Sequence, residues 1–569
     1  MKLQFQNKEH RAGKREALLS NLRDAISLAM SKKDYVSARK SIRKLEHYSK
    51  MEAMEQTVIL EVGRGNIKAA EKEYRKLCSI AREKTPYHLF LEAKILYQQD
   101  RVIEALQVLH QANIPNEEYD APHLDQFYNL LGQCHKFLGN NKEAIEAYLF
   151  ACKKTHVIET AIVAYSSYLF NLHYIPVSIS EQREAAKKFQ TIFNHVKQFS
   201  HPVPAQKKTK IRVGYISPDL RKHVVLRFSY VFFAKYDHER FEVFLYANNL
   251  EDNFSRHLAK IVDCWRNVSG HSMEEIAKLI YADKIDILMD LAGHTAGSCI
   301  SSLAYKPAPI QISGIGYWAS TGLKTVDYFL GDKYLDTEEA KQGFTEELLV
   351  LPDSHFCYAE VVDVPPIGEL PCKRNGYVTF GCFNNFSKMN HGVLQAWAKI
   401  LQQLPDARLL LKARIFNREE NRAFAMHRME QDGIPLDRVD VRRFDLRYMD
   451  EYNDMDIALD TFPYPGGTTT CDALYMSVPM ITLRGKSHGE RFGSSILENM
   501  GLGELCANTV EEYIEKAVAL AQDRERLDTF HQTVKETLRE SPVMNADLYM
   551  KNVQSAYEAI WNRYIGQHS

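Results

Sequence analysis

The chain has 569 residues, of which 45% are hydrophobic, and its formal net charge is −1. This length predicts about three to four domains, and the near-neutral charge does not point to a nucleic-acid partner. No stretch of about 18 apolar residues indicates a membrane span, and the polar N-terminus lacks the apolar segment of a signal peptide. The ten cysteines are scattered without metal-ligand spacing. This pattern is typical of free thiols, so we expect a cytoplasmic protein.

The first part of the chain has the apolar spacing of helices and contains almost no strand signal. A pattern of small and large residues recurs in it, marked by Ala38, Ala70, Ala105 and Ala144. This is the spacing of tetratricopeptide repeats, in which two antiparallel helices meet at small residues. Unrelated helical hairpins are the alternative, mainly for the first two units. Stacked repeats present a concave surface that suits an extended peptide or a partner protein.

From Lys210 onward, short apolar strands alternate with helices. One series begins with IRVGYIS and a second with YVTFGCFN, and a loop-like stretch with three prolines separates them. Such alternation predicts parallel sheets covered by helices, whose ligands bind beyond the carboxyl ends of the strands. We expect helical repeats at 1–160, a helical linker at 161–204, doubly wound domains at 205–370 and 371–545, and a C-terminal helix at 546–569.

A glycine- and threonine-rich stretch, DTFPYPGGTTTCDALYM, occupies residues 460–476. The apolar run MDIALD before it predicts a buried strand, and the spacing after it predicts a helix that ends at Pro479. The stretch is therefore a strand-to-helix turn, which presents backbone N–H groups at the positive end of a helix dipole. Such a turn can bind an anion. The alternative is an ordinary turn capped by a threonine.

Other polar residues follow the predicted strands of both sheets. In the first domain they include Asp219, His223 and His294. In the second domain they include Asn384, Asn385, Lys388, Lys412, Arg414, His488 and Arg491. A lysine, amide side chains and a helix N-terminus suit a diphosphate, and histidines opposite them suit proton transfer or orientation of a hydroxyl. A lone histidine at a strand end is more often structural.

The acidic residues between Asp445 and Asp460 are numerous. Most of them fall on a predicted helix surface, so we interpret them as solvated and expect neither a metal site nor another cofactor. Lys388 and backbone amides would then have to neutralise a departing diphosphate. Charge-assisted hydrogen bonds of roughly 1.5–3 kcal/mol each make this feasible.

Several long motifs occur here in the order known from one enzyme family. They include VGYISPDLRKH, DLAGHT, FGCFNNFSKMN, LDTFPYPGGTTTCDALYMSVPMITL and HGERFGSSIL. With these motifs the chain resembles, over nearly its whole length, the O-linked N-acetylglucosamine transferases and their bacterial and plant relatives, family 41 of the glycosyltransferases. The resemblance implies an α + α/β fold, with tetratricopeptide-type helical repeats followed by two Rossmann-like lobes of the GT-B type. The large insert between the lobes of the animal enzymes is absent here.

The resemblance also implies metal-independent, inverting transfer of a sugar from a nucleotide donor to a protein hydroxyl. In the second lobe, Lys388 corresponds to the diphosphate-binding lysine, with Asn384 and Asn385 beside it. Asp472 corresponds to the acid that holds the donor's ribose. In the first lobe, His223 corresponds to the family's active-site histidine, and His294 to a histidine common in bacterial and plant members, where animal enzymes have a tyrosine. We expect His223, His294 and Lys388 to be catalytic. We add to the donor-binding residues the phosphate-binding turn and two arginines: Gly466, Gly467, Thr468, Thr469, Thr470, Arg414 and Arg491.

One position departs from many relatives, which carry a histidine twelve residues before the LDT aspartate. Tyr448 stands there in this chain. Its ring can still stack on a base, and its bulk mildly favours uracil over guanine. Uridine donors are also common in the family, so the resemblance implies UDP-N-acetylglucosamine as donor and Ser/Thr hydroxyls of a protein as acceptor.

We expect the repeats to hold the acceptor, and we leave homo-oligomerisation open. One alternative is a protein O-fucosyltransferase that uses GDP-fucose, as in a plant branch of the family. The other is a repeat scaffold with inactive lobes, against which the retained Lys388 and His223 argue.

Overall fold

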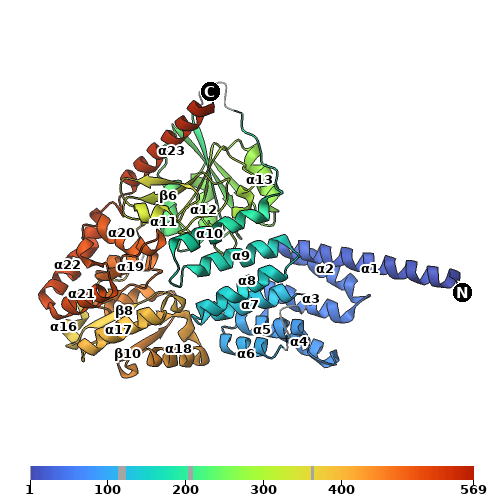
Figure 1. The fold of residues 1–569 in the computed structure, drawn as a ribbon, viewed down its shortest axis with the longest axis horizontal. Coiled ribbons are helices and arrows are strands. Elements are labelled where there is room, and N and C mark those ends of the chain that lie inside the picture. The colour runs from blue at the N-terminus through green and yellow to red at the C-terminus, as the bar shows by residue number, and fades with distance from the viewer. Residues whose placement is uncertain (1, 113, 115–122, 203–208, 361–363, 569) are drawn as a thin grey trace. The chain divides into compact units, whose positions relative to one another are not determined.

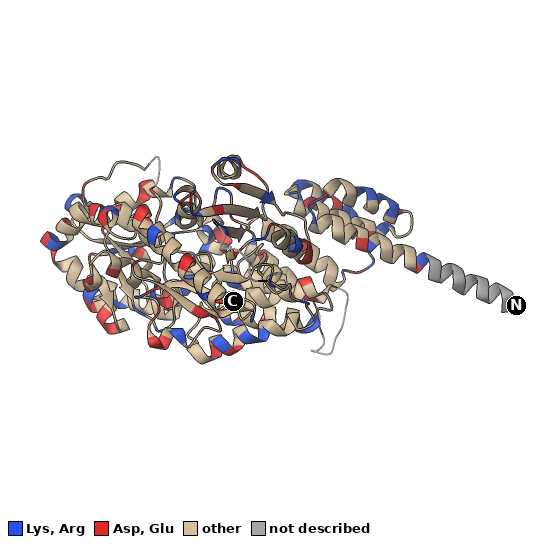
Figure 2. Ribbon diagram, turned by 90° about the horizontal axis from the view of Figure 1, so that it is seen from above, with Lys and Arg blue, Asp and Glu red and all other residues tan. Residues whose placement is uncertain are grey.

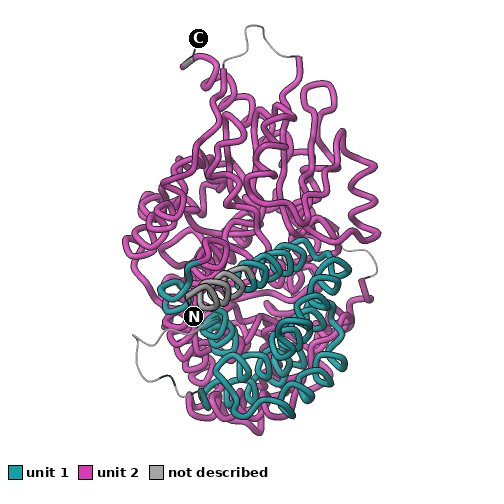
Figure 3. The backbone as a smooth tube through the Cα atoms, turned by 90° about the vertical axis from the view of Figure 1, so that its right-hand side faces the viewer, with its two compact units in different colours: residues 1–135, 150–156 teal, residues 136–149, 157–569 magenta. Residues whose placement is uncertain are grey.

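The computed structural model describes the chain except for residues 1, 113, 115–122, 203–208, 361–363 and 569. The last two residues of the helical linker predicted at 161–204, and part of the loop-like stretch with three prolines, therefore lie outside the described residues. The chain forms two compact units, residues 1–135 with 150–156 and residues 136–149 with 157–569 (Figures 1 and 3). Within the described segments, no helix has the length and apolar character needed to cross a membrane.

The first unit is built from helices. They are α1 (Lys2–Ser31), α2 (Tyr35–Glu46), α3 (Lys50–Gly63), α4 (Ile67–Ile80), α5 (Pro86–Gln98) and α6 (Val102–His110). The next two helices, α7 (Leu124–Phe137) and α8 (Asn141–Lys154), contribute residues to both units. Acidic and basic residues are interspersed along the chain in Figure 2.

The repeat spacing read from the sequence has a direct structural counterpart. Each marker alanine is the fourth residue of its helix in α2, α4, α6 and α8, and each is fully buried: Ala38, Ala70, Ala105 and Ala144. Five positions before each alanine the backbone has a positive φ, at Lys33, Gly65, Asp100 and Gly139. The same left-handed turn thus precedes the second helix of each hairpin, and a small residue lets the paired helices approach. The predicted helical repeats are confirmed.

The first lobe of the second unit is a seven-stranded parallel sheet in the order β3-β2-β1-β4-β5-β6-β7. Its strands are β1 (Ile211–Ser217), β2 (Phe241–Ala247), β3 (Cys264–Asn267), β4 (Ile287–Asp290), β5 (Ile310–Ser313), β6 (Tyr328–Asp332) and β7 (Glu347–Leu351). Its helices are α11 (Leu226–Ala234), α12 (Asn253–Ile261), α13 (Met273–Ala282), α14 (Ile300–Leu303) and α15 (Glu338–Lys341). Every residue of β4 and β5 is buried, as expected for strands covered on both faces.

The helical segment before the first sheet packs against it. The helices α9 (Ile158–Leu172) and α10 (Ile179–Phe189) and the 3-10 helix η1 (Gln190–Phe193) supply Leu169, Phe189 and Phe193 to the core of this lobe. These side chains share one hydrophobic cluster with residues of α13 and α14. The segment predicted as a linker is therefore also part of the lobe's core.

The second lobe is a six-stranded parallel sheet in the order β10-β9-β8-β11-β12-β13. Its strands are β8 (Thr379–Cys382), β9 (Arg408–Ala413), β10 (Val439–Arg443), β11 (Ile457–Leu459), β12 (Met480–Leu483) and β13 (Cys506–Ala507). Its α-helices are α16 (Pro371–Asn375), α17 (His391–Gln403), α18 (Glu419–Gln431), α19 (Thr468–Tyr475), α20 (Phe492–Asn499), α21 (Val510–Gln522) and α22 (Arg524–Glu540). Its 3-10 helices are η2 (Phe386–Lys388), η3 (Arg414–Asn417), η4 (Leu436–Arg438), η5 (Tyr448–Asp454), η6 (Gly489–Arg491) and η7 (Gly503–Leu505).

The last helix, α23 (Ala546–His568), returns to the first lobe (Figure 1). The hydroxyl of Tyr557 lies 3.3 Å from that of Tyr215 in β1. The chain therefore passes between the lobes twice, once in the segment after β7 and once between α22 and α23. The two passages touch, because the backbone N–H of Tyr358 donates to the carbonyl of Val543 at 2.7 Å.

Candidate active site

The turn between β11 and α19 leaves the start of a helix without a side-chain cap. The N-cap residue of α19 is Gly467, and no side chain accepts a hydrogen bond from the first backbone N–H groups of the helix. The threonine-capped turn that the sequence left open is therefore not formed. The residues at this end are Thr468, Thr469 and Thr470, and their amides lie at the positive end of the helix dipole. This geometry suits an anion such as a phosphate.

The buried carboxylate of Asp460 holds the backbone of this turn in place. Oδ1 of Asp460 accepts hydrogen bonds from the backbone N–H of Gly466 at 2.7 Å and of Thr461 at 2.9 Å. Its Oδ2 accepts from the hydroxyl of Thr482 at 2.8 Å. Burial raises the pKa of Asp460 to about 6. Because the carboxylate is fully buried and uses both oxygens, Asp460 fixes the turn and does not face a ligand.

Asn384 ties the end of β8 to the first turn of α19. Its Oδ1 accepts from the hydroxyl of Thr469 at 2.7 Å, and its Nδ2 donates to Oγ1 of Thr461 at 3.2 Å. The neighbouring Asn385 is exposed and begins η2 without a side-chain bond to that helix. The structure thus brings Asn384 to the turn and leaves Asn385 at its edge.

Lys388 ends η2 and lies against the residues that precede the two glycines. Its Nζ donates to the carbonyl of Pro465 at 2.7 Å and sits 3.7 Å from the ring centroid of Tyr464. Burial lowers the pKa of Lys388 to about 8, and the charge of Asp460 opposes this shift. A cation held by a single backbone carbonyl beside an uncapped helix can change its partner to a phosphate oxygen at small cost.

Asp472 lies one turn into α19 and is almost inaccessible, with 1% of its surface exposed. Its Oδ2 accepts from the hydroxyl of Tyr448 at 2.8 Å. Its Oδ1 accepts from the hydroxyl of Tyr358 and forms an ion pair with Arg227 of the first lobe. The carboxylate predicted to hold a ribose is therefore already bound by three side chains, and Tyr448 uses its hydroxyl here.

The two predicted histidines of the first lobe differ sharply. His223 precedes α11, and 34% of its side chain is exposed. Its Nδ1 lies 3.4 Å from Oδ1 of Asp219, a carboxylate that counteracts the lowering of the pKa of His223 by burial. His223 lies four residues before Arg227, and the pair of Arg227 with Asp472 brings this segment to the second lobe. His223 is thus a partly exposed base on the segment whose Arg227 contacts the second lobe.

His294 lies in the interior of the first lobe. Its Nδ1 is 2.9 Å from Oγ of Ser166, and its Nε2 is 3.0 Å from the carbonyl oxygen of Thr321. Burial lowers the pKa of His294 to about 4. Both ring nitrogens have protein partners, so these contacts describe a structural residue. A catalytic part for His294 stays a prediction that the geometry does not support.

Residues 164–362 and 370–553 match the family model described as Glycosyl transferase family 41. The chain belongs to glycosyl transferase family 41. One relative is the probable UDP-N-acetylglucosamine–peptide N-acetylglucosaminyltransferase SPINDLY of Arabidopsis thaliana. This chain is 38% identical to it over 362 residues, and the alignment covers 62% of this chain and 40% of the relative. This chain is also 35% identical over 409 residues to the protein of the same name from Oryza sativa subsp. japonica, and that alignment covers 70% of this chain and 44% of the relative. The chain thus spans about two fifths of the length of these relatives.

A solved structure of a mutant of the O-GlcNAc transferase of Thermobaculum terrenum superposes on this chain with a TM-score of 0.77. The two are 25% identical, and the match covers 98% of this chain and 99% of that one. The family and the fold class predicted from the motifs are confirmed.

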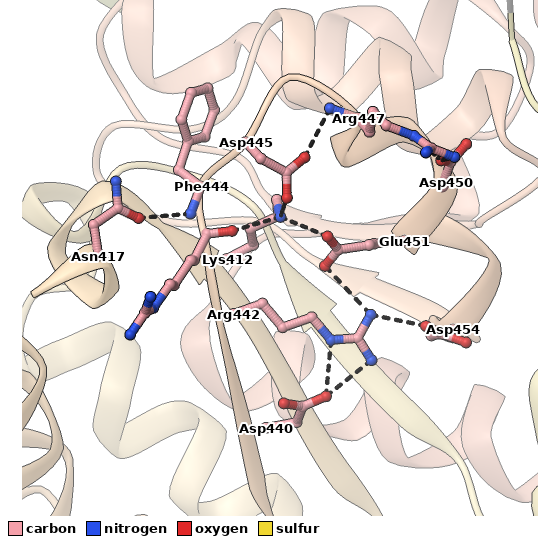
Figure 4. A network of polar contacts seen from close by, with 11 residues as sticks. Lys412, Asn417, Asp440, Arg442, Phe444, Asp445, Arg447, Asp450, Glu451 and Asp454 are labelled. Atoms are coloured by element: carbon pink, nitrogen blue, oxygen red, sulfur yellow. Dashed lines mark hydrogen bonds and ion pairs between the residues drawn. The ribbon is translucent and has the colours of Figure 1, made fainter. Parts of the chain in front are cut away.

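In this family 41 chain, a polar network joins β9 and β10 to Asp445 and to residues of η5, the 3-10 helix that begins at Tyr448 (Figure 4). Nζ of the buried Lys412 donates to the carbonyl of Arg443 at 2.6 Å and contacts carboxylate oxygens of Asp445 at 3.1 Å and Glu451 at 2.6 Å. A second cation extends the network, because Arg442 contacts Asp440, Glu451 and Asp454. Of the acidic residues predicted to be solvated, Asp445 is exposed and Asp454 partly exposed, but both also pair with these cations, whereas the side chain of Glu451 is 21% exposed and lies between Lys412 and Arg442.

The remaining predicted donor-binding residues lie apart from the turn or use other partners. Arg491 donates through Nε to the carbonyl of Tyr334 at 2.7 Å and through a terminal nitrogen to that of Gly485 at 3.0 Å. Arg414 is exposed at the start of η3. Nδ1 of His488 lies 2.7 Å from Oδ1 of Asp336 in the protein interior. The donor-binding parts of Arg491 and Arg414 stay predictions.

Sequence reasoning missed four residues of the site. Tyr464 and Asp460 come shortly before the glycines in the same motif, so their position near a Gly-rich turn was a usable signal. Tyr358 lies in the segment LPDSHFCY, whose part in the site no local pattern revealed. Arg227 carries no signal at all, because its partner Asp472 is 245 residues away in the sequence.

Among the described residues, no group of three or more His, Cys, Asp or Glu could hold a metal ion.

Proposed function

We propose that this chain is an inverting protein O-glycosyltransferase that moves N-acetylglucosamine from UDP-N-acetylglucosamine to Ser/Thr hydroxyls of a protein. One observation carries the proposal: an uncapped helix N-terminus, Lys388 and the buried Asp472 lie together at the carboxyl edge of the second sheet. These are the groups that a nucleoside diphosphate requires, namely amides and a cation for the phosphates and an acid for the ribose. The names of the relatives support the choice of donor and acceptor.

In the reaction, the acceptor oxygen forms a bond to the anomeric carbon while the bond from that carbon to the diphosphate breaks. The electron pair of the broken bond leaves with the diphosphate, whose added charge Lys388 and the amides of α19 stabilise. Each such charge-assisted contact is worth roughly 1.5–3 kcal/mol. The proton of the hydroxyl must go to a base, and His223 is the candidate that is partly exposed and paired with a carboxylate.

We assign the acceptor to the helical repeats and the reaction to the cytoplasm. The first unit carries a groove of about 330 Å³ between α4, α5 and α6, lined by residues that include Glu71, Tyr74 and Glu92. A groove with both apolar and charged walls suits an extended peptide. All ten cysteines are free thiols, which supports a reducing compartment.

The test measures ligand binding and transfer separately. Because a ligand that binds only the folded state at roughly 100 Kd stabilises by about 2.7 kcal/mol, UDP should raise the Tm clearly and GDP at equal concentration much less. Intact-mass analysis of candidate acceptors, incubated with the enzyme and a panel of nucleotide sugars, should show the mass of one N-acetylhexosamine. A larger shift with GDP and the addition of a deoxyhexose would instead establish the fucosyltransferase. Nucleotide binding without transfer from any sugar would favour the inactive scaffold.

A further inference from the structure

Arg227 of the first lobe occupies the carboxylate that the proposed function gives to the donor's ribose. Its guanidinium forms an ion pair with Asp472 and donates to the hydroxyl of Tyr358 at 2.9 Å. The Asp472 side chain is 1% exposed, whereas 23% of the Arg227 side chain is exposed. A ribose hydroxyl can reach Asp472 only if one of its present partners moves, and the partly exposed arginine is free to do so on the solvent side.

The start of α11, which carries Arg227, lies beside the turn between β11 and α19. The ring of Phe228 comes to 4.0 Å from the point where a Cβ atom on Gly467 would lie. The backbone N–H of Ala359 donates to the carbonyl of Arg227 at 2.6 Å, which fixes the start of α11. The position of the arginine on the chain is therefore set, and only its side chain has to turn.

The expected phosphate site lies about one helical turn from Asp472 along α19. Asp472 lies four residues after Thr468, and one helical turn rises about 5.4 Å. A guanidinium that rests on Asp472 is thus about one turn from the amides that would hold the diphosphate. The flexible side chain of an arginine can cover this distance by changing rotamers, without movement of α11.

We propose that Arg227 is a donor-binding residue supplied by the first lobe, whose guanidinium pairs with Asp472 and turns to the diphosphate when the ribose takes this carboxylate. After the exchange, the hydroxyls of the ribose, Tyr358 and Tyr448 donate to the carboxylate, and the guanidinium pairs with phosphate oxygens. The planar guanidinium suits two parallel contacts with a phosphate, which a lysine cannot make. This inference rests on the proposed nucleotide site.

The test compares a nucleoside diphosphate with its nucleoside, by calorimetry for UDP and by ligand-observed NMR for uridine. Arg227→Gln should weaken UDP binding about tenfold or more, as expected for the loss of a charged contact. Uridine binding should stay equal or improve, because the variant frees Asp472 and uridine has no phosphate. The matched control is Arg256→Gln, an exposed arginine on α12 of the same lobe, which should change neither affinity.

Because Arg227→Gln leaves Asp472 buried without its ion pair, a second comparison protects against poor folding. The double variant Arg227→Gln/Asp472→Asn removes both charges and should bind UDP about tenfold less tightly than Asp472→Asn alone, with equal uridine binding. Equal losses for UDP and uridine, or no loss for UDP, would overturn the inference while the wild-type nucleotide site stands. A wild-type protein that binds neither UDP nor GDP would instead overturn the proposed function, and this inference with it.

Discussion

The two lobes hold the polar residues at their sheet edges in opposite ways. In the second lobe, the amides at the start of α19 have no side-chain cap, and Lys388 is held by the carbonyl of Pro465. In the first lobe, His294 has protein partners at both ring nitrogens and is buried. A ligand can replace the present partner of Lys388, and can bind the amides of α19, at little cost. To reach His294, it would have to break two hydrogen bonds in the buried core of the first lobe.

His223 is the exception in the first lobe, because it is partly exposed and lies on the segment that reaches the second lobe. The comparison thus separates residues that can bind from residues that only lie at a strand end. It predicts large losses of activity at His223 and Lys388 and a loss of stability at His294.

The largest effect is expected at His223. His223→Ala should lower kcat by about 10²-fold or more, because general-base catalysis typically contributes about 10²–10⁴-fold. The Tm should not change, since the side chain is partly exposed. Initial rates of transfer to an acceptor peptide measure this, with the exposed His271→Ala as control. Unchanged kcat would remove His223 from the reaction and leave the base unassigned.

Lys388→Ala should lower transfer by about 10²-fold, as loss of one preorganised stabiliser of a leaving group typically does. Circular dichroism should still show a folded protein, because Nζ makes one exchangeable bond to a carbonyl. Lys399→Ala, at an exposed position on α17, is the matched control. Near-normal turnover in the folded variant would contradict the assignment of Lys388 to the diphosphate.

His294→Ala should destabilise the protein by about 1–3 kcal/mol, because the hydroxyl of Ser166 and the carbonyl of Thr321 lose a buried partner. Denaturant titration measures this, and His257→Ala, at an exposed position, should have almost no effect. The remaining folded enzyme should keep most of its kcat. A stable variant with a collapsed kcat would show that His294 acts in the reaction after all.

The affinity for UDP should fall as the pH rises above about 8. Burial lowers the pKa of Lys388 to about 8, so the ammonium that binds the diphosphate is lost as the pH passes this value. The affinity can fall by at most about tenfold per pH unit when one proton is linked to binding. Calorimetry between pH 7 and 9 measures it. A Lys388→Ala variant that keeps the same slope would trace the effect to another group.

The smallest expected effect is that of metal removal. The proposal gives the neutralisation of the diphosphate to Lys388 and the amides of α19, so transfer should persist in excess EDTA. Assays with and without EDTA, with a metal-dependent transferase as positive control, measure this. A loss that magnesium or manganese specifically restores would show that the second lobe needs a cation besides Lys388.

The repeats and the candidate site of the second lobe could be predicted from the sequence for a common reason, which is that the residues of each lie in short contiguous segments. The alanine spacing recurs along one helix pair after another, and the Gly–Thr turn, Asp460 and Asp472 share a single motif. Neither periodicity nor motifs could tell that His294 is covered by Ser166, or that Lys412 pairs with Asp445 and Glu451. Those properties depend on segments that only the folded chain brings together, as does the pair of Arg227 with Asp472.

The return of α23 to the first lobe has a mechanical consequence. Two backbone segments connect the lobes, one after β7 and one between α22 and α23. The hydrogen bond from the N–H of Tyr358 to the carbonyl of Val543 joins the two segments. Other contacts also join the lobes, because Nδ1 of His488 pairs with Asp336 and Arg491 donates to the carbonyl of Tyr334. Tyr358 lies where the two backbone segments meet, and its hydroxyl donates to Asp472. A movement of one lobe against the other at this point therefore displaces a partner of the carboxylate that the proposed function gives to the ribose.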